Sequence, residues 1–336
     1  MIKQVIILAK YSPLLNEFDT QNAIALVKDK FAAELCDSLD LSRVSAPLFV
    51  KQGSGLNDDL NGFERPVSFD ILETGEIAEV VHSLAKWKRM ALLKYGFSRH
   101  TGLYTDMNAI RRDEECDNIH SIYVDQWDWE KIIAAEDRTM EYLQATVRSI
   151  YGAIMRTAKA VCDKYPVIEN YLPEKISFIT TSELEEKFPE LTPKQREYKI
   201  TRELGAVFIM QIGGRLKSGN KHDGRAPDYD DWSLNGDIMI YNRVLDIALE
   251  ISSMGIRVDR ESLLAQLKAE NKEERLNFEF HKMLLEGVLP LTIGGGIGQS
   301  RLCMLLLHKA HIGEVQVSIW PEKEISRCKA KGIQLL

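Results

Sequence analysis

The stretch that most constrains the fold reads GGGIGQSR at residues 294–301, and the apolar run LCMLLL follows it at residues 302–307. It is no dinucleotide fingerprint, because Gln299 stands where the third glycine is required, and it lacks the Gly-Lys-Ser/Thr of a P-loop. Clustered glycines indicate a backbone that closely approaches another group. Arg301, at the start of a helix, could anchor a polyphosphate. A tight turn packed on a core helix explains the stretch equally well.

A second stretch reads IRRDEE at residues 110–115 and is followed by SIYVDQWD at residues 121–128. This Arg-x-Asp-Glu turn and its strand resemble motif two of the class II aminoacyl-tRNA synthetase catalytic domain. The glycine-rich stretch, taken as a strand that leads through Arg301 into a helix, resembles motif three, and VSAPL at residues 44–48 resembles the proline-ended strand of motif one. The three occur in the expected order. The resemblance implies an antiparallel sheet flanked by helices, and a homodimer built through motif one.

Size, charge and cysteine usage set broad bounds. The chain has 336 residues, a net charge of −7 and five cysteines, none in a Cys-x-x-Cys pair. No repeat or low-complexity linker forces a second domain. The acidic balance argues against a nucleic-acid surface, and the cysteine spacing suggests neither a zinc site nor a disulfide framework. The apolar run at residues 5–9 is too short for a signal peptide or membrane span, so we expect a cytoplasmic location.

Periodicity along the chain predicts helices and short strands that do not alternate regularly. This pattern favours an α+β fold with a largely antiparallel sheet over a doubly wound one. Helices are expected from a cap at Asp19 or Thr20, from Ile77 to Gly96, over 130–164, and around 263–267 and 276–285. Strands are expected from Ser121 and over 176–180, 206–212, 237–241, 245–252 and 315–319, with loops at 52–64 and 218–232.

Lys88 interrupts the apolar stripe of the helix expected over 77–96. Such a lysine either extends its ammonium group from the edge of the core into water or faces a pocket that receives an anion. In the strand from Ser121, side chains alternate between faces. Gln126 and Asp128 share one face, and Trp127 shares the other with Trp129. Gln126 and Asp128 therefore suit a pocket for a polar small molecule, with a solvated strand end as the alternative.

Acidic residues on the later strands are candidate metal ligands. Glu250 is expected to share a strand face with Ser252, and Asp237 lies on a nearby strand. Two converging carboxylates can hold a Mg²⁺ that also touches phosphates, although spacing alone is a weak indicator. His308 and His311 lie at an apolar helix end and are expected to be structural. A charge run in the 218–232 loop is more often solvated, but a long loop also suits function; it contains Arg225, Asp228, Asp230 and Asp231.

Longer blocks narrow the resemblance. They read VHSLAKWKR at 81–89, SIYVDQWDWE at 121–130, DGRAPDYDDW at 223–232 and SSMGIR at 252–257. From about residue 15 to 320 the chain resembles the ammonia-dependent asparagine synthetases (aspartate–ammonia ligases). That family is similar to the catalytic core of aspartyl- and asparaginyl-tRNA synthetases without the anticodon-binding domain. Some forty residues precede Val44, so we expect a single catalytic domain over 1–336. Residues 70–75 and 322–336 match poorly and receive no role.

The resemblance implies a reaction in two steps. The β-carboxylate of L-aspartate attacks the α-phosphate of Mg-ATP, which gives β-aspartyl-adenylate and pyrophosphate. Ammonia then attacks the acyl carbonyl and releases L-asparagine and AMP. The implied cofactor is Mg²⁺, and ammonia, not glutamine, is the expected nitrogen donor. In such chemistry the protein chiefly positions groups and neutralises charge.

Site residues follow from the same resemblance. Arg111 would hold the α-phosphate, Glu114 the adenine side, and Arg301 the terminal phosphates. Asp237 and Glu250 would carry Mg²⁺, and Glu250 would also contact ATP. The residues implied at the amino-acid and ammonia side are Asp58, Gln126, Asp128, Asp230 and Ser253; Asp58, Gln126, Arg111 and Arg301 are the implied catalytic set.

Two further residues concern substrate orientation. Lys88 and Arg257 match positions that grip the substrate side-chain carboxylate in aspartyl-tRNA synthetases. The activated carboxylate here must be the β one, so we infer that this pair holds the α-carboxylate. An ammonium ion must lose a proton before it attacks, and a nearby carboxylate is a reasonable acceptor.

Two alternatives stay open at the level of sequence. The first is a synthetase paralogue that passes its adenylate to tRNA or to another amine, against which the acidic charge argues. The second is an inactive paralogue with a regulatory or binding role, against which the joint presence of Arg111, Glu114, Glu250 and Arg301 argues.

Overall fold

One large mixed sheet organises the protein. A computed structural model describes residues 11–58 and 64–336. Its eight-stranded sheet has the order β1-β5-β6-β11-β10-β9-β8-β7, and only the two edge pairs, β1 with β5 and β7 with β8, are parallel. The strands are β1 (Leu41–Arg43), β5 (Gly102–Ile110), β6 (Tyr123–Ile132), β11 (Thr292–Gly298), β10 (Ile247–Arg257), β9 (Asp230–Asn242), β8 (Ala206–Met210) and β7 (Ser177–Thr180). The expected α+β fold with a largely antiparallel sheet is confirmed.

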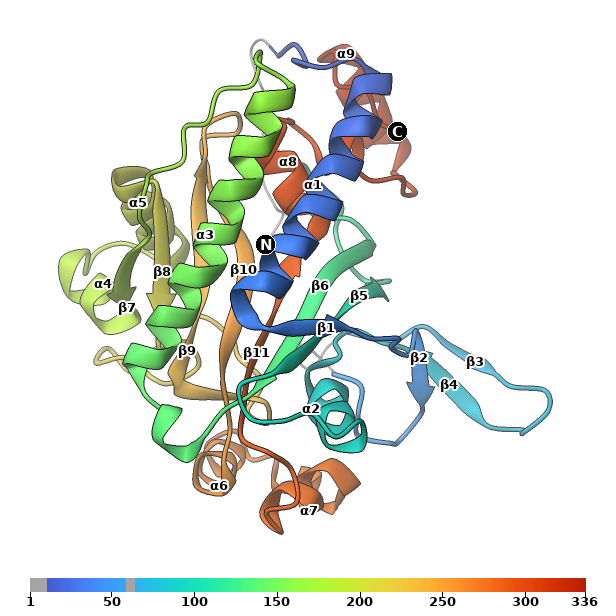
Figure 1. Cartoon of the computed structure of the whole chain (residues 1–336), viewed down its shortest axis with the longest axis vertical. Coiled ribbons are helices and arrows are strands. Elements are labelled where there is room, and N and C mark those ends of the chain that lie inside the picture. The colour runs from blue at the N-terminus through green and yellow to red at the C-terminus, as the bar shows by residue number, and fades with distance from the viewer. Residues whose placement is uncertain (1–10, 59–63) are drawn as a thin grey trace.

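Two long helices cover one face of this sheet. Helices α1 (Glu17–Leu39) and α3 (Met140–Lys164) lie side by side across it, with α8 (Gln299–Leu306) beside them (Figure 1). The side chain of Asn16 caps α1 by accepting from the Asp19 amide, so the predicted cap at Asp19 or Thr20 is wrong by one turn. Val27, Phe31 and Leu35 repeat every four residues and are buried in the main core between helices and sheet.

The remaining helices surround the other edges of the sheet. They are α2 (Ala85–Lys94), α4 (Thr181–Lys187), α5 (Pro193–Leu204), α6 (Arg260–Ala269), α7 (Glu279–Leu285) and α9 (Glu322–Ala330). In Figure 1, α4 and α5 flank β7 and β8, while α6 and α7 lie together at the end of β10 and β11. Within the ranges that the structure describes, no helix is long and apolar enough to cross a bilayer.

A small three-stranded sheet projects from the body. Strands β2 (Phe49–Lys51), β4 (Ile77–Val80) and β3 (Ser68–Asp70) pair antiparallel, in that order, and extend away from the large sheet (Figure 1). The helix predicted from Ile77 is therefore wrong at its start, because residues 77–80 pair on both sides as a strand. The helix begins only at Ala85, and Gly96 follows its end with φ +70° as expected.

Four other expectations need correction. The helix predicted from Glu130 starts only at Met140, because Glu130 and its two successors continue the alternation of β6. The tight turn offered as an alternative for the glycine-rich stretch is wrong, because this stretch is a central strand paired with β6 and β10, as the resemblance to motif three implies. The strand near motif one ends at Arg43, before residues 44–48. Residues 315–319 form no strand, and Val317 and Ile319 are exposed.

Candidate active site

A pocket of about 540 Å³ opens on the sheet face opposite the core that α1 and α3 cover. Its floor comes from β6, β11, β10 and β9, and its walls come from the segments before β5 and β9 and from the turn after β5. All twelve candidate site residues line it: Asp58, Lys88, Arg111, Glu114, Gln126, Asp128, Asp230, Asp237, Glu250, Ser253, Arg257 and Arg301. The structure thus brings together segments that are up to 243 residues apart, from 58 to 301.

Strand β6 separates the pocket from the core. Gln126 and Asp128 line the pocket, while Trp127 and Trp129 are fully buried in the main core on the other face. The ring of Trp127 lies 4.6 Å from that of Phe31 on α1. The predicted alternation of this strand is confirmed, and the solvated alternative is wrong.

The glycines of β11 make room for side chains of the neighbouring strands. A Cβ at Gly294 would clash with the Glu130 carboxylate and come within 2.6 Å of Arg257 Nη2. A Cβ at Gly296 would lie 2.5 Å from Gln126 Oε1. The close approach inferred from the sequence is therefore an approach to the protein's own site residues.

A bulge in β10 decides which of its residues face the pocket. Glu250 pairs with Met239 and Ser252 with the next residue, Ile238, so one residue of β10 is extra. Leu249 before the bulge, Ile251 within it and Met254 after it all lie in the main core. Beyond the bulge the alternation has therefore changed phase, and Glu250 shares the pocket face with Ser253 and Arg257. Ser252 lines the pocket together with Glu250, as expected from the sequence, although the bulge interrupts the regular alternation between them.

Charged side chains at one end of the pocket are buried and already paired. Arg257 bonds both carboxylate oxygens of Glu130 and one oxygen of Asp230, and Lys88 donates to Asp128. Lys88 also donates to the carbonyls of Trp129 (2.9 Å) and Gly295 (3.2 Å), and its Nζ lies 3.8 Å from Glu130 Oε2. We call this group the paired end: Lys88, Asp128, Glu130, Asp230 and Arg257.

These contacts set the charge state of the paired end. Burial alone would raise the pKa of Glu130, but Arg257 and Lys88 hold that pKa below its ordinary value. Lys88 is fully buried, so the alternative of an ammonium group extended into water is wrong. Three of the five N–H groups of Arg257 are engaged by the two carboxylates, which leaves two for a ligand.

The opposite end of the pocket holds its cations more loosely. Arg111 Nη1 lies 4.0 Å from Glu114 Oε2, and Arg301 Nη1 lies 3.9 Å from Glu250 Oε2. The Arg301 group also donates to the Glu250 carbonyl at 3.0 Å. Nε of Arg111 is buried without a hydrogen-bond partner in the described ranges, 11–58 and 64–336. We call this group the open end: Arg111, Glu114, Glu250 and Arg301.

Arg225 lies between the two ends. It donates to Asp237 at 2.7 Å and to Ser253, and its Nε lies 3.8 Å from Asp230. Burial, with the Glu250 carboxylate as a smaller cause, raises the pKa of Asp237 to about 6 against the lowering effect of Arg225. A carboxylate whose charge is disfavoured by a second carboxylate on the adjacent strand fits a divalent cation, whose positive charge would favour the ionised form of Asp237.

The charge run at 225–231 is buried, so the interpretation as a solvated surface is wrong. Arg225 and Asp230 line the pocket. Asp228 is fully buried beside it, where it accepts from Arg275 (2.9 Å) and lies 3.1 Å from Lys86 Nζ. Burial would raise the pKa of Asp228, but these cations hold it far below its ordinary value.

Sequence reasoning missed Glu130 and undervalued Arg225. Glu130 continues the face of Gln126 and Asp128 at the same two-residue spacing, and this signal was available. The prediction of a helix from Glu130 onward hides this two-residue spacing. Nothing in local sequence distinguishes Arg225 from a solvated arginine, because the groups that bury it come from β9 and β10.

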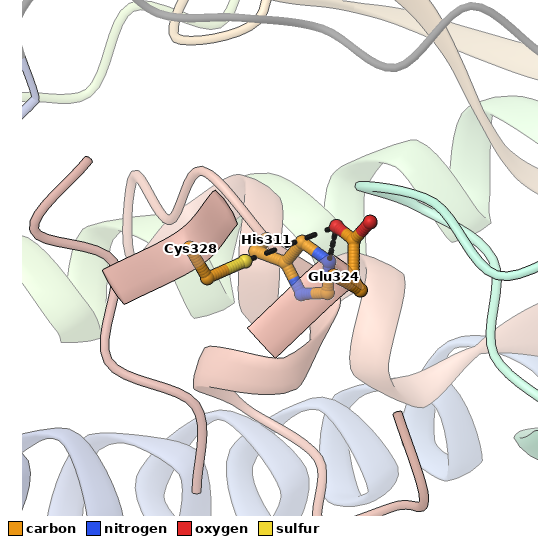
Figure 2. Close-up of side chains that lie close together, drawn as sticks. All are labelled: His311, Glu324 and Cys328. Carbon is orange, nitrogen blue, oxygen red and sulfur yellow. Dashed lines mark hydrogen bonds and ion pairs between the residues drawn. The ribbon is translucent and has the colours of Figure 1, made fainter. Parts of the chain in front are cut away.

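A second polar cluster lies away from the pocket. His311, Glu324 and Cys328 approach one another where α9 packs on the body (Figure 2). His311 Nδ1 accepts from the Gly313 amide, so the other nitrogen carries the proton that it donates to Glu324 at 3.0 Å. Burial lowers the pKa of His311 to about 4, and Arg327 also bonds Glu324. These bonds give His311 a structural role, as expected, in fastening α9.

Known proteins of one enzyme family are similar to this chain over nearly its whole length. A family model described as aspartate-ammonia ligase matches residues 18–332. An aspartate–ammonia ligase of Clostridium perfringens is 62% identical over 327 residues, which cover 97% of each chain. One of Levilactobacillus brevis is 58% identical over 333 residues, which cover 99% of each chain.

Solved structures resemble the chain in fold. Asparaginyl-tRNA synthetase of Pyrococcus horikoshii, complexed with asparaginyl-adenylate, superposes with a TM-score of 0.65 at 14% identity, over 90% of this chain and 70% of that one. The Entamoeba histolytica enzyme with the same ligand gives 0.60 at 12% identity, over 89% and 66%. The chain spans about two thirds of these synthetases, and the likeness shows a class II synthetase catalytic fold. On the family match and these identities, the chain belongs to the aspartate–ammonia ligase family.

Proposed function

We propose that the protein amidates L-aspartate with ammonia in an ATP-dependent reaction through β-aspartyl-adenylate, and releases L-asparagine, AMP and pyrophosphate. The observation that carries this proposal is the division of one pocket into a buried end with tightly paired charges and an open end whose arginines are only loosely paired. A zwitterionic amino acid suits the first, and a polyphosphate suits the second. Family membership at about 60% identity supports the same activity.

The paired end suits the amino-acid head group of aspartate. With Arg225, it holds three cations and three carboxylates, counting Lys88, Arg225 and Arg257 against Asp128, Glu130 and Asp230. A zwitterionic head group enters without changing this balance. The two N–H groups that remain on Arg257 can hold the α-carboxylate, and Lys88 supports them through Glu130. Asp128 and Asp230 then face the α-ammonium group, with Gln126 and Ser253 beside them.

The open end suits the nucleotide. Arg111 has a buried Nε–H without a partner in the described ranges, and a phosphate oxygen can accept from it. Arg301, from the N-terminus of α8, reaches the same end and can neutralise the outer phosphates, while Glu114 faces the adenine. Asp237 and Glu250 would hold Mg²⁺, which when bound neutralises phosphate charge as the adenylate forms.

The two steps use these groups without covalent participation of the protein. The β-carboxylate oxygen bonds to the α-phosphorus as the bond to the leaving pyrophosphate breaks. Arg111 stabilises the charge that develops there. Ammonia then forms the C–N bond, and the bond from the acyl carbon to the phosphate oxygen breaks with AMP as leaving group. Asp58 and Gln126 line the pocket wall where we place the ammonia.

Assembly and location belong to the same proposal. We propose a homodimer with residues 44–48 at a two-fold interface, a cytoplasmic location and no nucleic-acid partner. Exposed Leu48 and Phe49, at the start of β2, supply apolar surface for such a contact. Light scattering at micromolar concentration tests the dimer: a monomeric mass with full activity would contradict it.

One assay tests the activity. The pure protein is incubated with aspartate, ATP, Mg²⁺ and ammonium, and asparagine and AMP are measured. Pyrophosphate exchange into ATP is followed in parallel, with aspartate but without ammonium. We expect both activities, without tRNA. Exchange without asparagine would favour another amine acceptor, and the absence of both would favour the inactive paralogue. Efficient synthesis from glutamine, with free ammonia removed, would contradict ammonia as the donor.

A further inference from the structure

One buried nitrogen that lines the pocket is not used by the roles assigned so far. His82 is 2% exposed and belongs to the pocket wall between β4 and α2. Its Nε2 has no hydrogen-bond partner within residues 11–58 and 64–336. A buried polar atom without a partner costs about 1 to 3 kcal/mol in a folded protein. Such an atom in a pocket wall therefore points to a ligand.

The contacts of His82 fix its tautomer. Nδ1 lies 3.0 Å from the main-chain carbonyl oxygen of Asp58. A carbonyl oxygen only accepts, so Nδ1 carries the hydrogen, and Nε2 of the neutral ring presents a lone pair. The missing ligand must therefore supply an N–H or O–H group. Phosphate oxygens and carboxylates, which only accept, do not fit.

The imidazole is also held in place. The main-chain amide of His82 donates to Asn57 Oδ1 at 2.8 Å, so residues 57 and 58 fix both its backbone and its ring. Lys86 holds the same segment in place by donating to the main-chain carbonyls of Gly55 (3.2 Å) and Asn57 (3.4 Å). A basic nitrogen on a rigid frame is the arrangement that proton transfer needs.

Two other buried histidines differ. His222 and His281 each bond a carboxylate, those of Glu197 and Asp228, at 3.1 Å. Neither lines the pocket. His82 alone among these three combines a place in the pocket wall, a carbonyl partner and an accepting nitrogen. Asp58, whose carbonyl orients the ring, carries a carboxylate in the same wall, and a carboxylate attracts a cation.

We propose that His82 is the base that removes a proton from ammonium before the second step. This inference rests on the proposed function. Asp58 attracts the ammonium ion, one N–H proton moves to His82 Nε2, and the freed lone pair attacks the acyl carbon of the adenylate. The C–N bond forms, and the bond from that carbon to the phosphate oxygen breaks, with its electron pair leaving on AMP. The adduct nitrogen loses its second proton to solvent, and His82 later returns its proton.

The test separates the two steps and two nucleophiles. His82→Asn keeps an N–H donor for the Asp58 carbonyl but lacks the basic Nε2. Three rates are measured: aspartate-dependent pyrophosphate exchange, asparagine from ammonium, and aspartyl hydroxamate from hydroxylamine, which is largely uncharged at neutral pH. We expect exchange within about threefold of wild type, asparagine synthesis at least about 100-fold lower, and hydroxamate formation much less affected.

Each other outcome overturns the proposal. An equal loss with both nucleophiles means that His82 removes no proton from ammonium. A raised KM for aspartate in the exchange assay means that Nε2 accepts from the α-ammonium group instead. An undiminished rate of asparagine synthesis gives His82 only a structural role. Wild-type protein without exchange would count against the proposed function itself, so the two failures are distinguishable.

Two further variants guard against misinterpretation. If His82→Asn does not fold, His82→Gln carries the same test, because its amide reaches the Nε2 position without being basic. His222→Asn removes an equally buried histidine outside the pocket. We expect it to leave the ratio of asparagine to hydroxamate formation unchanged, and the same fall in that ratio as in the His82 variant would overturn the proposal.

Discussion

The two ends of the pocket solve opposite electrostatic problems. At the paired end, Arg257 and Lys88 are buried and bonded to acids before any ligand arrives. At the open end, Arg111 and Arg301 are about a quarter exposed, and among residues 11–58 and 64–336 their ion-pair partners lie 3.9–4.0 Å away. The paired end is therefore part of the folded core, and its charges depend on one another. The open end holds its charges loosely, and we expect folding to depend on it much less.

The sharpest way to break this contrast is to remove the arginine at the paired end. Arg257→Gln leaves Glu130 and Asp230 buried with reduced compensation. We expect a loss of about 3 to 5 kcal/mol in unfolding free energy, together with loss of aspartate-dependent exchange. Urea denaturation measures the first effect. Arg257→Lys, which keeps the charge but not the two-sided contact, should recover only part of it; wild-type stability in Arg257→Gln would show that the pairs contribute nothing.

The matching change at the open end should affect catalysis alone. Arg111→Ala is expected to remove about 3 kcal/mol of transition-state stabilisation. The rate of pyrophosphate exchange should therefore fall by over about 100-fold. Its thermal midpoint should stay within a degree or two of wild type, because its ion pair with Glu114, as described within residues 11–58 and 64–336, is 4.0 Å long. The adjacent, exposed Arg112→Ala serves as control. Near-wild-type exchange in Arg111→Ala would mean that motif two is misplaced.

A variant of Lys88 tests whether the paired end binds aspartate or ATP. Lys88→Met should weaken aspartate binding by about 2 kcal/mol, which corresponds to a KM for aspartate that is roughly 30-fold higher. The KM for ATP should rise much less. β-Alanine, which lacks the α-carboxylate, should be a very poor substrate of the wild type for the same reason. Lys309→Met, an equally buried lysine bonded to Thr20 on the other side of the sheet, controls for lost packing. A larger effect on ATP than on aspartate would place Lys88 with the phosphates.

Asp237 gives the smallest effect and tests the boundary between the ends. Its pKa of about 6 in the fold exceeds the ordinary 3.8, so its ionisation destabilises the protein. The stability that its protonated form contributes is complete below pH 4 and is lost as the pH rises through 6. Asp237→Asn should therefore be more stable than wild type by about 1 kcal/mol at pH 8.

Thermal unfolding between pH 4 and pH 8, with and without Mg²⁺, checks this prediction. The advantage of Asp237→Asn should disappear as the pH falls below 6. Magnesium should raise the midpoint of the wild type at pH 8 and have less effect on the variant. A variant that is less stable at every pH would show that the contact of Arg225 with the charged Asp237 outweighs its burial.

Much of the fold could be predicted because its signals are local. The stripes of α1 and α3, the alternation of β6 and the strands from β7 to β10 all depend on residues close in sequence. The errors arose where distant partners decide. Residues 77–80 form a strand because β2 and β3 pair with them, and the glycine-rich stretch is a strand because β6 and β10 lie on either side of it.

The same distinction holds for the site. Gln126 and Asp128 could be placed in a pocket from the period of one strand. Arg225 could not, because its burial comes from segments that the fold brings together. The twelve candidates line one pocket, while their individual roles stay predictions that the variants above test.

Because β10 carries an extra residue, the site depends on the number of residues in this strand as well as on their identity. Deleting Ser252 alone would change no charge and remove little volume. It would, however, rotate everything downstream by half a turn about the strand. Arg257 would then point toward the tryptophans of the core, and Met254 would face the pocket. Between Glu250 and Arg257, we therefore expect a deletion of one residue to be more damaging than most substitutions. A design that grafts this strand must keep its number of residues even where its sequence changes.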